Sequence, residues 1–152
     1  VQRQLLGVGV RETLPAYAKV LIGLGVHSAY VVHGAGGADE ITPAGVNQVV
    51  AVGNAPQTCF DAEALGLESA PVSALEGGDK DQNLKLLIDL FDGEINPIRT
   101  AVLQNTAAAL LLAGIAGDAN EGVGLAKTAL DSGAAKRCLQ VLVHTSQREG
   151  QA

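Results

Sequence analysis

The first 33 residues carry a strand–helix–strand pattern, which limits the possible fold more than any other feature of the chain. Residues 5–10 and 28–33 are short apolar runs typical of strands, and residues 14–22 between them repeat apolar side chains at helical spacing. Thr13 is the predicted N-cap of this helix, and Pro15 stands in its first turn, where a missing N–H is harmless. Because such a unit crosses over with a right hand, it predicts two parallel strands and an α/β fold.

The rest of the chain adds one strand to the sheet and then becomes helical. Residues 47–52 are rich in β-branched side chains and predict a third strand. Further helices are predicted at residues 81–92, 97–113, 118–132 and 135–145. We therefore expect an α/β fold with a parallel-type sheet of about three or more strands, followed by a carboxyl-terminal cluster of helices.

Two of these helices differ in the burial that their sequences predict. Residues 97–113 are apolar on most of the helix circumference, so this helix should be buried on several sides. Residues 81–92 carry a single apolar stripe, which we expect to face the core. The stripe consists of Leu84, Leu87, Ile88 and Phe91.

The composition fits a single α/β domain over residues 1–152 and argues against several binding functions. Glycine is abundant, at 19 residues, and aromatic side chains are few, which suits tight turns between strands and helices. The net charge of −6 argues against general binding to nucleic acid or to a membrane surface. Cys59 and Cys138 are too few for a disulfide framework, and the first residues given do not show the charged-then-apolar pattern of a signal segment. We expect reduced thiols in a cytoplasmic protein.

The second strand runs into a glycine-rich loop that ends in two adjacent carboxylates. Gly34, Gly36 and Gly37 follow the strand, and Asp39 and Glu40 come shortly after them. Ligand sites in α/β sheets lie beyond the carboxyl ends of strands, and Mg²⁺ is typically held by one or two carboxylates together with substrate phosphates. The local pattern fits either a Mg²⁺ site or an ordinary polar surface loop. It lacks the lysine and the glycine spacing of known phosphate-binding loops.

Three other polar residues near this loop are interpreted as structural. His33 ends the strand and fits a hydrogen-bonded structural histidine better than a phosphate contact. Asn83 is expected to cap or bridge the turn at residues 77–78. Asn105 lies on the nearly apolar helix and is expected to hold an adjacent loop, because a buried amide needs hydrogen-bond partners.

Several segments, in order along the chain, resemble the anthranilate phosphoribosyltransferase family. The clearest is Val31-Val32-His33-Gly34 followed by Asp39-Glu40-Ile41, which resembles the family's VVHG…DE(I/L) signature, although Ala38 stands where the family often has leucine. The other segments are residues 4–8, 24–25, 66–67, 75–79 with 83, 102–110, 121–123 and 131–134. The resemblance spans nearly all of the chain.

This resemblance implies an incomplete domain of a nucleoside phosphorylase/phosphoribosyltransferase-like fold. The implied activity is Mg²⁺-dependent transfer of a phosphoribosyl group from phosphoribosyl pyrophosphate to anthranilate in tryptophan biosynthesis. Asp39 and Glu40 would bind Mg²⁺ and bridge it to the pyrophosphate, and Gly34, Gly36 and Gly37 would contact the same ligand. The resemblance also implies that the complete enzyme is a homodimer.

The family's pyrophosphate loop GTGGDG and its KHGN segment do not occur in this sequence. We therefore expect the chain to be the carboxyl-terminal part of a longer enzyme and to be inactive by itself. Two alternatives stay open at this point. One is an enzyme related to pyrimidine-nucleoside phosphorylase, and the other is a non-catalytic binding or scaffold remnant of the same fold.

Overall fold

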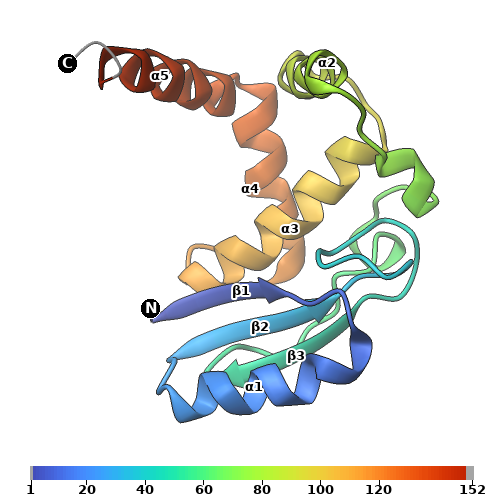
Figure 1. Ribbon diagram of the computed structural model, residues 1–152, viewed down its shortest axis with the longest axis vertical. Helices are drawn as coiled ribbons and strands as arrows, with labels where there is room; N and C mark the ends of the chain where they lie inside the picture. Colours follow the sequence, from blue (N-terminus) through green and yellow to red (C-terminus); the bar gives the residue numbers. More distant parts are fainter. Residues whose placement is uncertain (1, 150–152) are drawn as a thin grey trace.

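A three-stranded sheet forms the centre of the computed structural model, which describes residues 2–149. Its strands are β1 (Arg3–Gly7), β2 (Ser28–His33) and β3 (Gln48–Gly53), and β2 lies in the middle. β1 and β2 run parallel, so the predicted parallel pair is confirmed. β2 is buried along nearly its whole length, because it has a strand on each side and helices over both faces (Figure 1).

The third strand corrects one part of the expectation. β3 pairs antiparallel with β2, with Val50 opposite Val31, so the sheet is mixed rather than parallel throughout. A parallel neighbour needs a crossover connection, usually a helix. Residues 34–47 contain no helix, and the chain instead turns back along β2. The apolar run of β3 fits either direction, so its composition alone does not decide between them.

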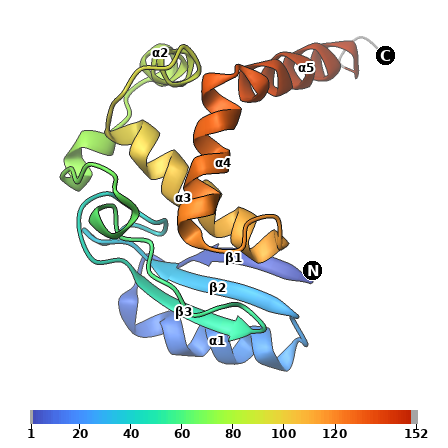
Figure 2. The ribbon, with the colours of Figure 1, turned by 180° about the vertical axis from the view of Figure 1, so that it is seen from behind.

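Helix α1 (Leu14–Gly23) covers one face of the sheet (Figures 1 and 2). Its buried side chains join a cluster with those of β2 and β3, and this cluster includes Leu14, Ala18, Leu21, Val31 and Val52. The helix begins where the sequence predicts, but Thr13 does not cap it. A 3-10 helix, η1 (Arg11–Thr13), leads into α1, and the Thr13 hydroxyl donates to the Val10 carbonyl at 2.6 Å.

Helix α3 (Pro97–Ala113) covers the other face, and α4 (Ala119–Asp131) packs along α3, with its first turns in the same core cluster as β2 (Figure 2). The expected burial of α3 on several sides is confirmed, because α3 contacts β1, β2 and α4. Gly122 permits the contact with α4, since a Cβ there would lie 2.9 Å from the Cα of Ala107. Both helices have side-chain N-caps, from Asn96 and Asp118.

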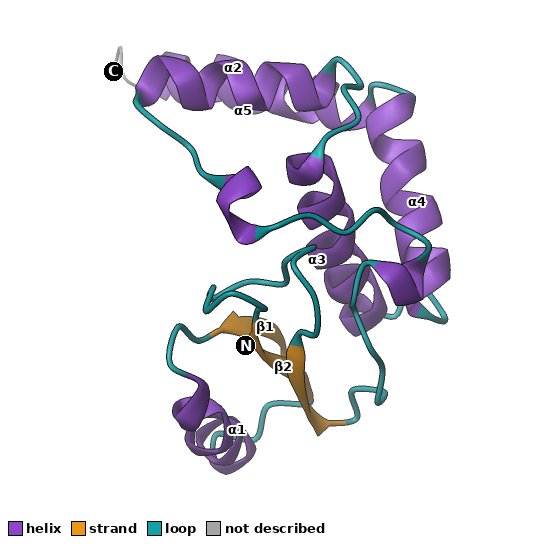
Figure 3. Ribbon diagram, turned by 90° about the vertical axis from the view of Figure 1, so that its right-hand side faces the viewer, coloured by secondary structure: helices purple, strands orange, loops and turns teal. Residues whose placement is uncertain are grey.

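Helices α2 (Lys80–Phe91) and α5 (Ala134–Glu149) lie at the end of the molecule opposite the sheet (Figures 1 and 3). An ion pair between Lys136 and Asp92 connects α5 to the end of α2. α2 begins one residue before its predicted start, and its N-cap pair was not predicted. Asp79 and Gln82 form a capping box there, with the Asp79 carboxylate accepting from the Gln82 amide at 2.9 Å.

The predicted burial of the α2 stripe is wrong for three of its four residues, since only Phe91 packs against the core. Leu84, Leu87 and Ile88 are 51%, 37% and 45% exposed, and the buried residue of this helix is Leu90. The spacing of the stripe is helical, but among the described residues only the last turns of α2 pack against the α3 and α4 layer, through Leu90 and Phe91. An apolar face is buried only where another element covers it.

Residues 61–79 carry no long element, but they include two short 3-10 helices, η2 (Glu63–Leu65) and η3 (Val72–Leu75). This stretch runs from the end of β3 towards α2, and η3 lies beside the glycine-rich loop. Among the residues that the structure describes, no helix is both long enough and apolar enough to cross a bilayer.

Candidate functional site

The candidate site lies on the loop of residues 34–47, which leaves β2 at the carboxyl end of the parallel strand pair. This loop folds back over the ends of both strands. A Cβ at Gly7 would lie 1.4 Å from the carbonyl oxygen of Asp39, and a Cβ at Gly34 would lie 1.9 Å from that of Glu40. Glycine is therefore required at both strand ends, because the backbone of the carboxylate pair packs directly against them.

The three glycines predicted to contact a ligand shape the turn itself. Gly36 and Gly37 have φ angles of 83° and 89°, which favour glycine strongly. The Gly34 amide donates to the Ala38 carbonyl at 2.9 Å, and the Gly37 amide donates to the Gly34 carbonyl at 3.1 Å. These two N–H groups are thus engaged within the turn, and ligand contact by the glycines stays a prediction.

The remainder of the loop is held by a buried side-chain amide. The Oδ1 atom of Asn47 accepts from the Ala35 amide at 3.2 Å and from the Thr42 amide at 2.9 Å. The Thr42 hydroxyl donates back to the Ala35 carbonyl at 2.9 Å. Asp61 fixes Asn47 in turn, because its carboxylate accepts from the Asn47 backbone amide at 2.7 Å. The two ends of the loop are therefore tied together.

A second pair of amides reaches the loop from α3. Asn105 accepts from the Ile41 amide at 3.1 Å and donates to the Ile41 carbonyl at 2.7 Å. Gln104 donates to the Thr42 carbonyl at 3.2 Å and to the Phe60 carbonyl at 2.7 Å. The expectation that Asn105 holds an adjacent loop is confirmed. Gln104 was missed, although a second amide beside Asn105 on a nearly apolar helix is a signal of the same kind.

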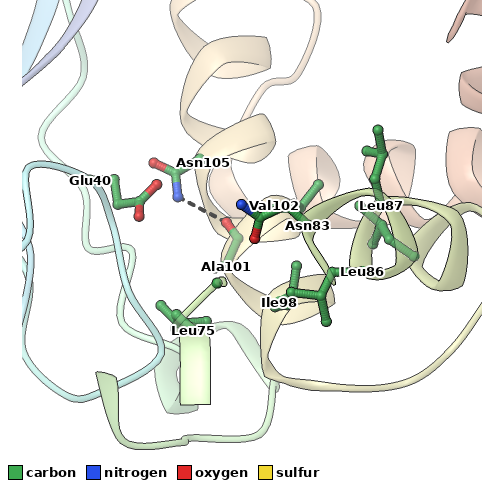
Figure 4. Close-up of a pocket in the computed structure, with 11 residues that line it drawn as sticks. Glu40, Leu75, Asn83, Leu86, Leu87, Ile98, Ala101, Val102 and Asn105 are labelled. Carbon is green, nitrogen blue, oxygen red and sulfur yellow. Dashed lines mark hydrogen bonds between the residues drawn. The ribbon is translucent and has the colours of Figure 1, made fainter. Parts of the chain in front are cut away.

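A cavity of about 370 Å³ opens between this loop, η3, α2 and α3 (Figure 4). Its lining is mostly apolar, and its polar side chains are Glu40, Asn83 and Asn105. Glu40 faces the space from one side, and α2 presents Leu86 and Leu87 on the other (Figure 4). A largely apolar pocket with a few polar groups is the usual form of a small-molecule site.

The two predicted metal ligands occupy different positions around this cavity. Both side chains are exposed, but Glu40 lines the cavity and Asp39 does not. Among residues 2–149, no group of three or more histidine, cysteine, aspartate or glutamate side chains comes together. A pair of carboxylates is still a suitable donor set for Mg²⁺, because that ion keeps waters and phosphate oxygens in its remaining positions.

His33 and Asn83 have the structural roles that the sequence suggests. The Nδ1 atom of His33 lies 2.8 Å from the Val8 carbonyl oxygen, which can only accept, so Nδ1 carries the proton. Asn83 accepts from the Gly78 amide at 2.9 Å and donates to the Gly78 carbonyl at 3.1 Å. Asn83 therefore bridges the turn before α2, as expected, and also lines the cavity.

Three comparisons with known proteins agree with this architecture. The anthranilate phosphoribosyltransferase of Parvibaculum lavamentivorans is 45% identical over 145 residues, which make up 94% of this chain and 42% of that protein. The crystal structure of the enzyme of that name from Thermus thermophilus superposes with a TM-score of 0.82 at 38% identity, covering 91% of this chain and 41% of that one. The Saccharomyces cerevisiae enzyme, solved in complex with PRPP (phosphoribosyl pyrophosphate) and Mg, superposes with a TM-score of 0.78 at 29% identity, covering 92% and 41%.

The chain therefore spans less than half the length of these relatives. The resemblance found in the sequence and the expectation of an incomplete α/β domain are both confirmed. Residues 1–136 match the family described as "Glycosyl transferase family, a/b domain". Because this match covers most of the sequence, the chain belongs to that glycosyl transferase family.

Proposed function

We propose that this chain forms the metal-binding side of an enzyme that transfers a phosphoribosyl group from phosphoribosyl pyrophosphate to anthranilate in tryptophan biosynthesis. The observation that carries the proposal is the placement of Glu40. Its carboxylate lines a cavity beyond the carboxyl end of the parallel pair, on a loop that is packed against two glycines. Relatives named for this activity support the choice of substrates, because one neighbour was solved with PRPP and Mg and another with 4-fluoroanthranilate.

The charges around the cavity support the need for a cation. Glu40 is the single ionisable residue among those that line it. A pyrophosphate would be repelled by an unaccompanied carboxylate, since like charges close together in a site of low dielectric are unfavourable. When bound, Mg²⁺ neutralises negative charge on the leaving pyrophosphate. Asp39 and Glu40 would hold the ion, and the rest of the loop of residues 34–47 would keep these two residues in place.

The proposed reaction requires little general acid–base catalysis from this chain. The C–O bond between the ribose carbon and the pyrophosphate breaks as that carbon gains cationic character, and the anthranilate amine then forms the C–N bond and releases one proton to solvent. Holding the two reactants in line supplies much of the rate enhancement. The apolar wall from α2 and α3 would exclude water from the reacting carbon.

The assembly and location of the enzyme follow the same resemblance. We propose that a complete enzyme containing this chain is a homodimer and that it works in the cytoplasm. The support for both is the family relationship, and neither depends on the geometry of the cavity.

Calorimetric titration of the complete protein that contains this chain with phosphoribosyl pyrophosphate, with and without Mg²⁺, tests the metal site. We expect Mg²⁺-dependent binding in the parent protein and its near loss in the double variant Asp39→Asn/Glu40→Gln, because amide oxygens are poorer ligands for Mg²⁺. The control is Glu63→Gln/Glu68→Gln, which removes the same charge from positions elsewhere on the chain. Unchanged Mg²⁺-dependent affinity in the first variant would overturn the assignment. A large loss of melting temperature would instead support a structural role for the pair.

A further inference from the structure

We infer that Asn105 is a positioning residue, which holds the carboxylate loop so that Glu40 faces the cavity. The inference rests on the proposed function, in which Glu40 helps to hold a divalent cation. It goes further because it assigns a role at this site to Asn105, which acts through the backbone of the loop rather than as a ligand of the ion. The observations that carry it are the two-point contact with Ile41, the lack of an ion pair to Glu40 among the described residues and the burial of α3.

The contact fixes both peptide groups of the residue that follows Glu40. The amide of Ile41 belongs to the peptide bond that Glu40 begins, and it donates to Asn105 Oδ1 at 3.1 Å. The carbonyl of Ile41 accepts from Asn105 Nδ2 at 2.7 Å. A donor and an acceptor that meet the same residue set its orientation as well as its position.

The Asn105 amide cannot rotate away from this arrangement without losing a further bond. Its Nδ2 atom also donates to the carbonyl of Ala101, one turn earlier on α3, at 2.9 Å. Figure 4 shows this bond beside the cavity, with Glu40 on the opposite side of Asn105. The neighbouring Gln104 is completely buried and bonds to the carbonyl of Thr42, so consecutive residues of α3 hold consecutive residues of the loop.

No ion pair in the described chain directs the Glu40 side chain. Within residues 2–149 the ion pairs join Lys85 to Asp89, Arg99 to Asp131 and Lys136 to Asp92, so none involves Glu40. The side chain of Ile41 is fully buried in the core, whereas that of Glu40 is exposed. The backbone between these two residues therefore sets the position from which the Glu40 side chain leaves the loop, and Asn105 bonds both peptide groups that flank Ile41.

The glycine turn that precedes the carboxylates explains why this loop needs contacts from α3. Gly36 and Gly37 adopt positive φ angles, and glycine loses more conformational freedom on ordering than any other residue. A loop of this composition needs contacts from a rigid element to keep one conformation. α3 is such an element, because a side chain caps its first turn and its buried residues lie in the same core cluster as those of the sheet.

The test compares Asn105→Leu with Asn83→Leu in this chain. Both asparagines line the same cavity and both bond the two backbone groups of one loop residue, but Asn83 holds Gly78 rather than the carboxylate loop. The probe is Mn²⁺, a paramagnetic substitute for Mg²⁺, titrated with inorganic pyrophosphate present and followed by electron paramagnetic resonance. Hydrogen exchange at the Ile41 amide reports directly on the bond to Asn105.

We expect Asn105→Leu to weaken Mn²⁺ binding by about 10-fold to 100-fold, the usual effect of removing a partner behind the metal ligands. The same variant should speed exchange at Ile41, while Asn83→Leu leaves both measurements near those of the parent chain. Asn105→Gln keeps a donor and an acceptor and should recover part of the affinity. If Asn105→Leu does not unfold cooperatively, Asn105→Ala takes its place in the comparison.

The outcomes separate this inference from the proposed function. A parent chain that binds no Mn²⁺ with pyrophosphate would overturn the proposed metal site. A parent chain that binds Mn²⁺ and an Asn105→Leu chain that binds it equally well, despite faster exchange at Ile41, would overturn the positioning role alone. Equal losses in Asn105→Leu and Asn83→Leu would also overturn it, because the effect would then not be specific to the carboxylate loop.

Discussion

The carbonyl oxygen of Asp39 lies only 1.4 Å from the point that a Cβ of Gly7 would occupy, so the end of β1 and the carboxylate loop pack backbone against backbone. We expect Gly7→Ala to push the loop away and to lower the free energy of unfolding by about 1–3 kcal/mol, as overpacking does. Affinity for phosphoribosyl pyrophosphate in the presence of Mg²⁺ should fall as well.

Denaturant unfolding and calorimetry measure the two effects. Gly9→Ala is the matched control, because a Cβ at Gly9 would have nothing within 4 Å. If Gly7→Ala matches the parent chain in stability and in affinity, the loop does not depend on this close approach.

The ion pair between Arg99 and Asp131 joins the first turn of α3 to the last turn of α4, with Nη2 and Oδ1 2.5 Å apart. The Arg99 side chain is 9% exposed, and its Nη1 atom has no hydrogen-bond partner among the described residues. Asp131→Asn should therefore destabilise the protein by about 1–3 kcal/mol, since it removes the countercharge from a buried guanidinium.

The comparison variant is Asp92→Asn, which breaks the exposed pair with Lys136 and should change stability by at most about 1 kcal/mol. Thermal or urea unfolding of the two variants gives the difference directly. Equal effects would mean that the burial of Arg99 has no energetic importance.

Tyr30 gives the stability of the fold a dependence on alkaline pH. The residue is fully buried, and its hydroxyl donates to the Pro56 carbonyl at 2.8 Å. Burial raises the pKa of Tyr30 from 10.0 to about 12, because the phenolate would be desolvated. The associated stability is complete below pH 10 and is lost as the pH rises towards about 12, where the folded protein also ionises.

Tyr30→Phe removes this titration. The variant should be less stable near neutral pH, by about 1 kcal/mol for the missing hydrogen bond, but its stability should fall less between pH 10 and about 12. Unfolding midpoints measured across that range test the prediction. Parallel pH profiles for the parent and the variant would contradict it.

The activity of the chain by itself depends on how much of the enzyme it contains. It spans 42% of the P. lavamentivorans relative, and we expect no measurable turnover of anthranilate and phosphoribosyl pyrophosphate by this chain alone. Adding the part of that relative which the chain does not match should restore some activity. The loss of anthranilate fluorescence measures turnover, with the complete relative as the positive control. Clear Mg²⁺-dependent turnover by the chain alone would refute the expectation.

Helices and strands whose bounds are set by neighbouring residues in the sequence were predictable. Asn96 before Pro97 marks the start of α3, and the strand ending at His33 is bounded as predicted, because capping and apolar runs are properties of neighbouring residues. The direction of β3 and the exposure of Leu84 were not predictable in the same way. Each depends on which element lies beside it in space.

The candidate site was predictable in part, and for a similar reason. Asp39 and Glu40 stand out as adjacent carboxylates after a glycine turn, whereas the need for glycine at position 7 becomes clear only when the loop is seen against β1. Asn105 was expected to hold a loop, but its partner, Ile41, is 64 residues away along the chain. Contacts at that separation follow from the packing of α3 on the sheet.

The cavity beside Glu40 has one wall from a buried helix and one wall from a largely exposed helix. Asn105 and Ala101 belong to α3, which is embedded between the sheet and α4, whereas Leu86 and Leu87 belong to α2, whose apolar side chains are largely open to solvent (Figure 4). A molecule that fills the cavity would cover apolar side chains of α2 that are open to solvent in its absence, and burying them would contribute to its binding free energy. Binding at the carboxylate loop would thus add contacts to α2, the helix at the end of the molecule opposite the sheet (Figure 1).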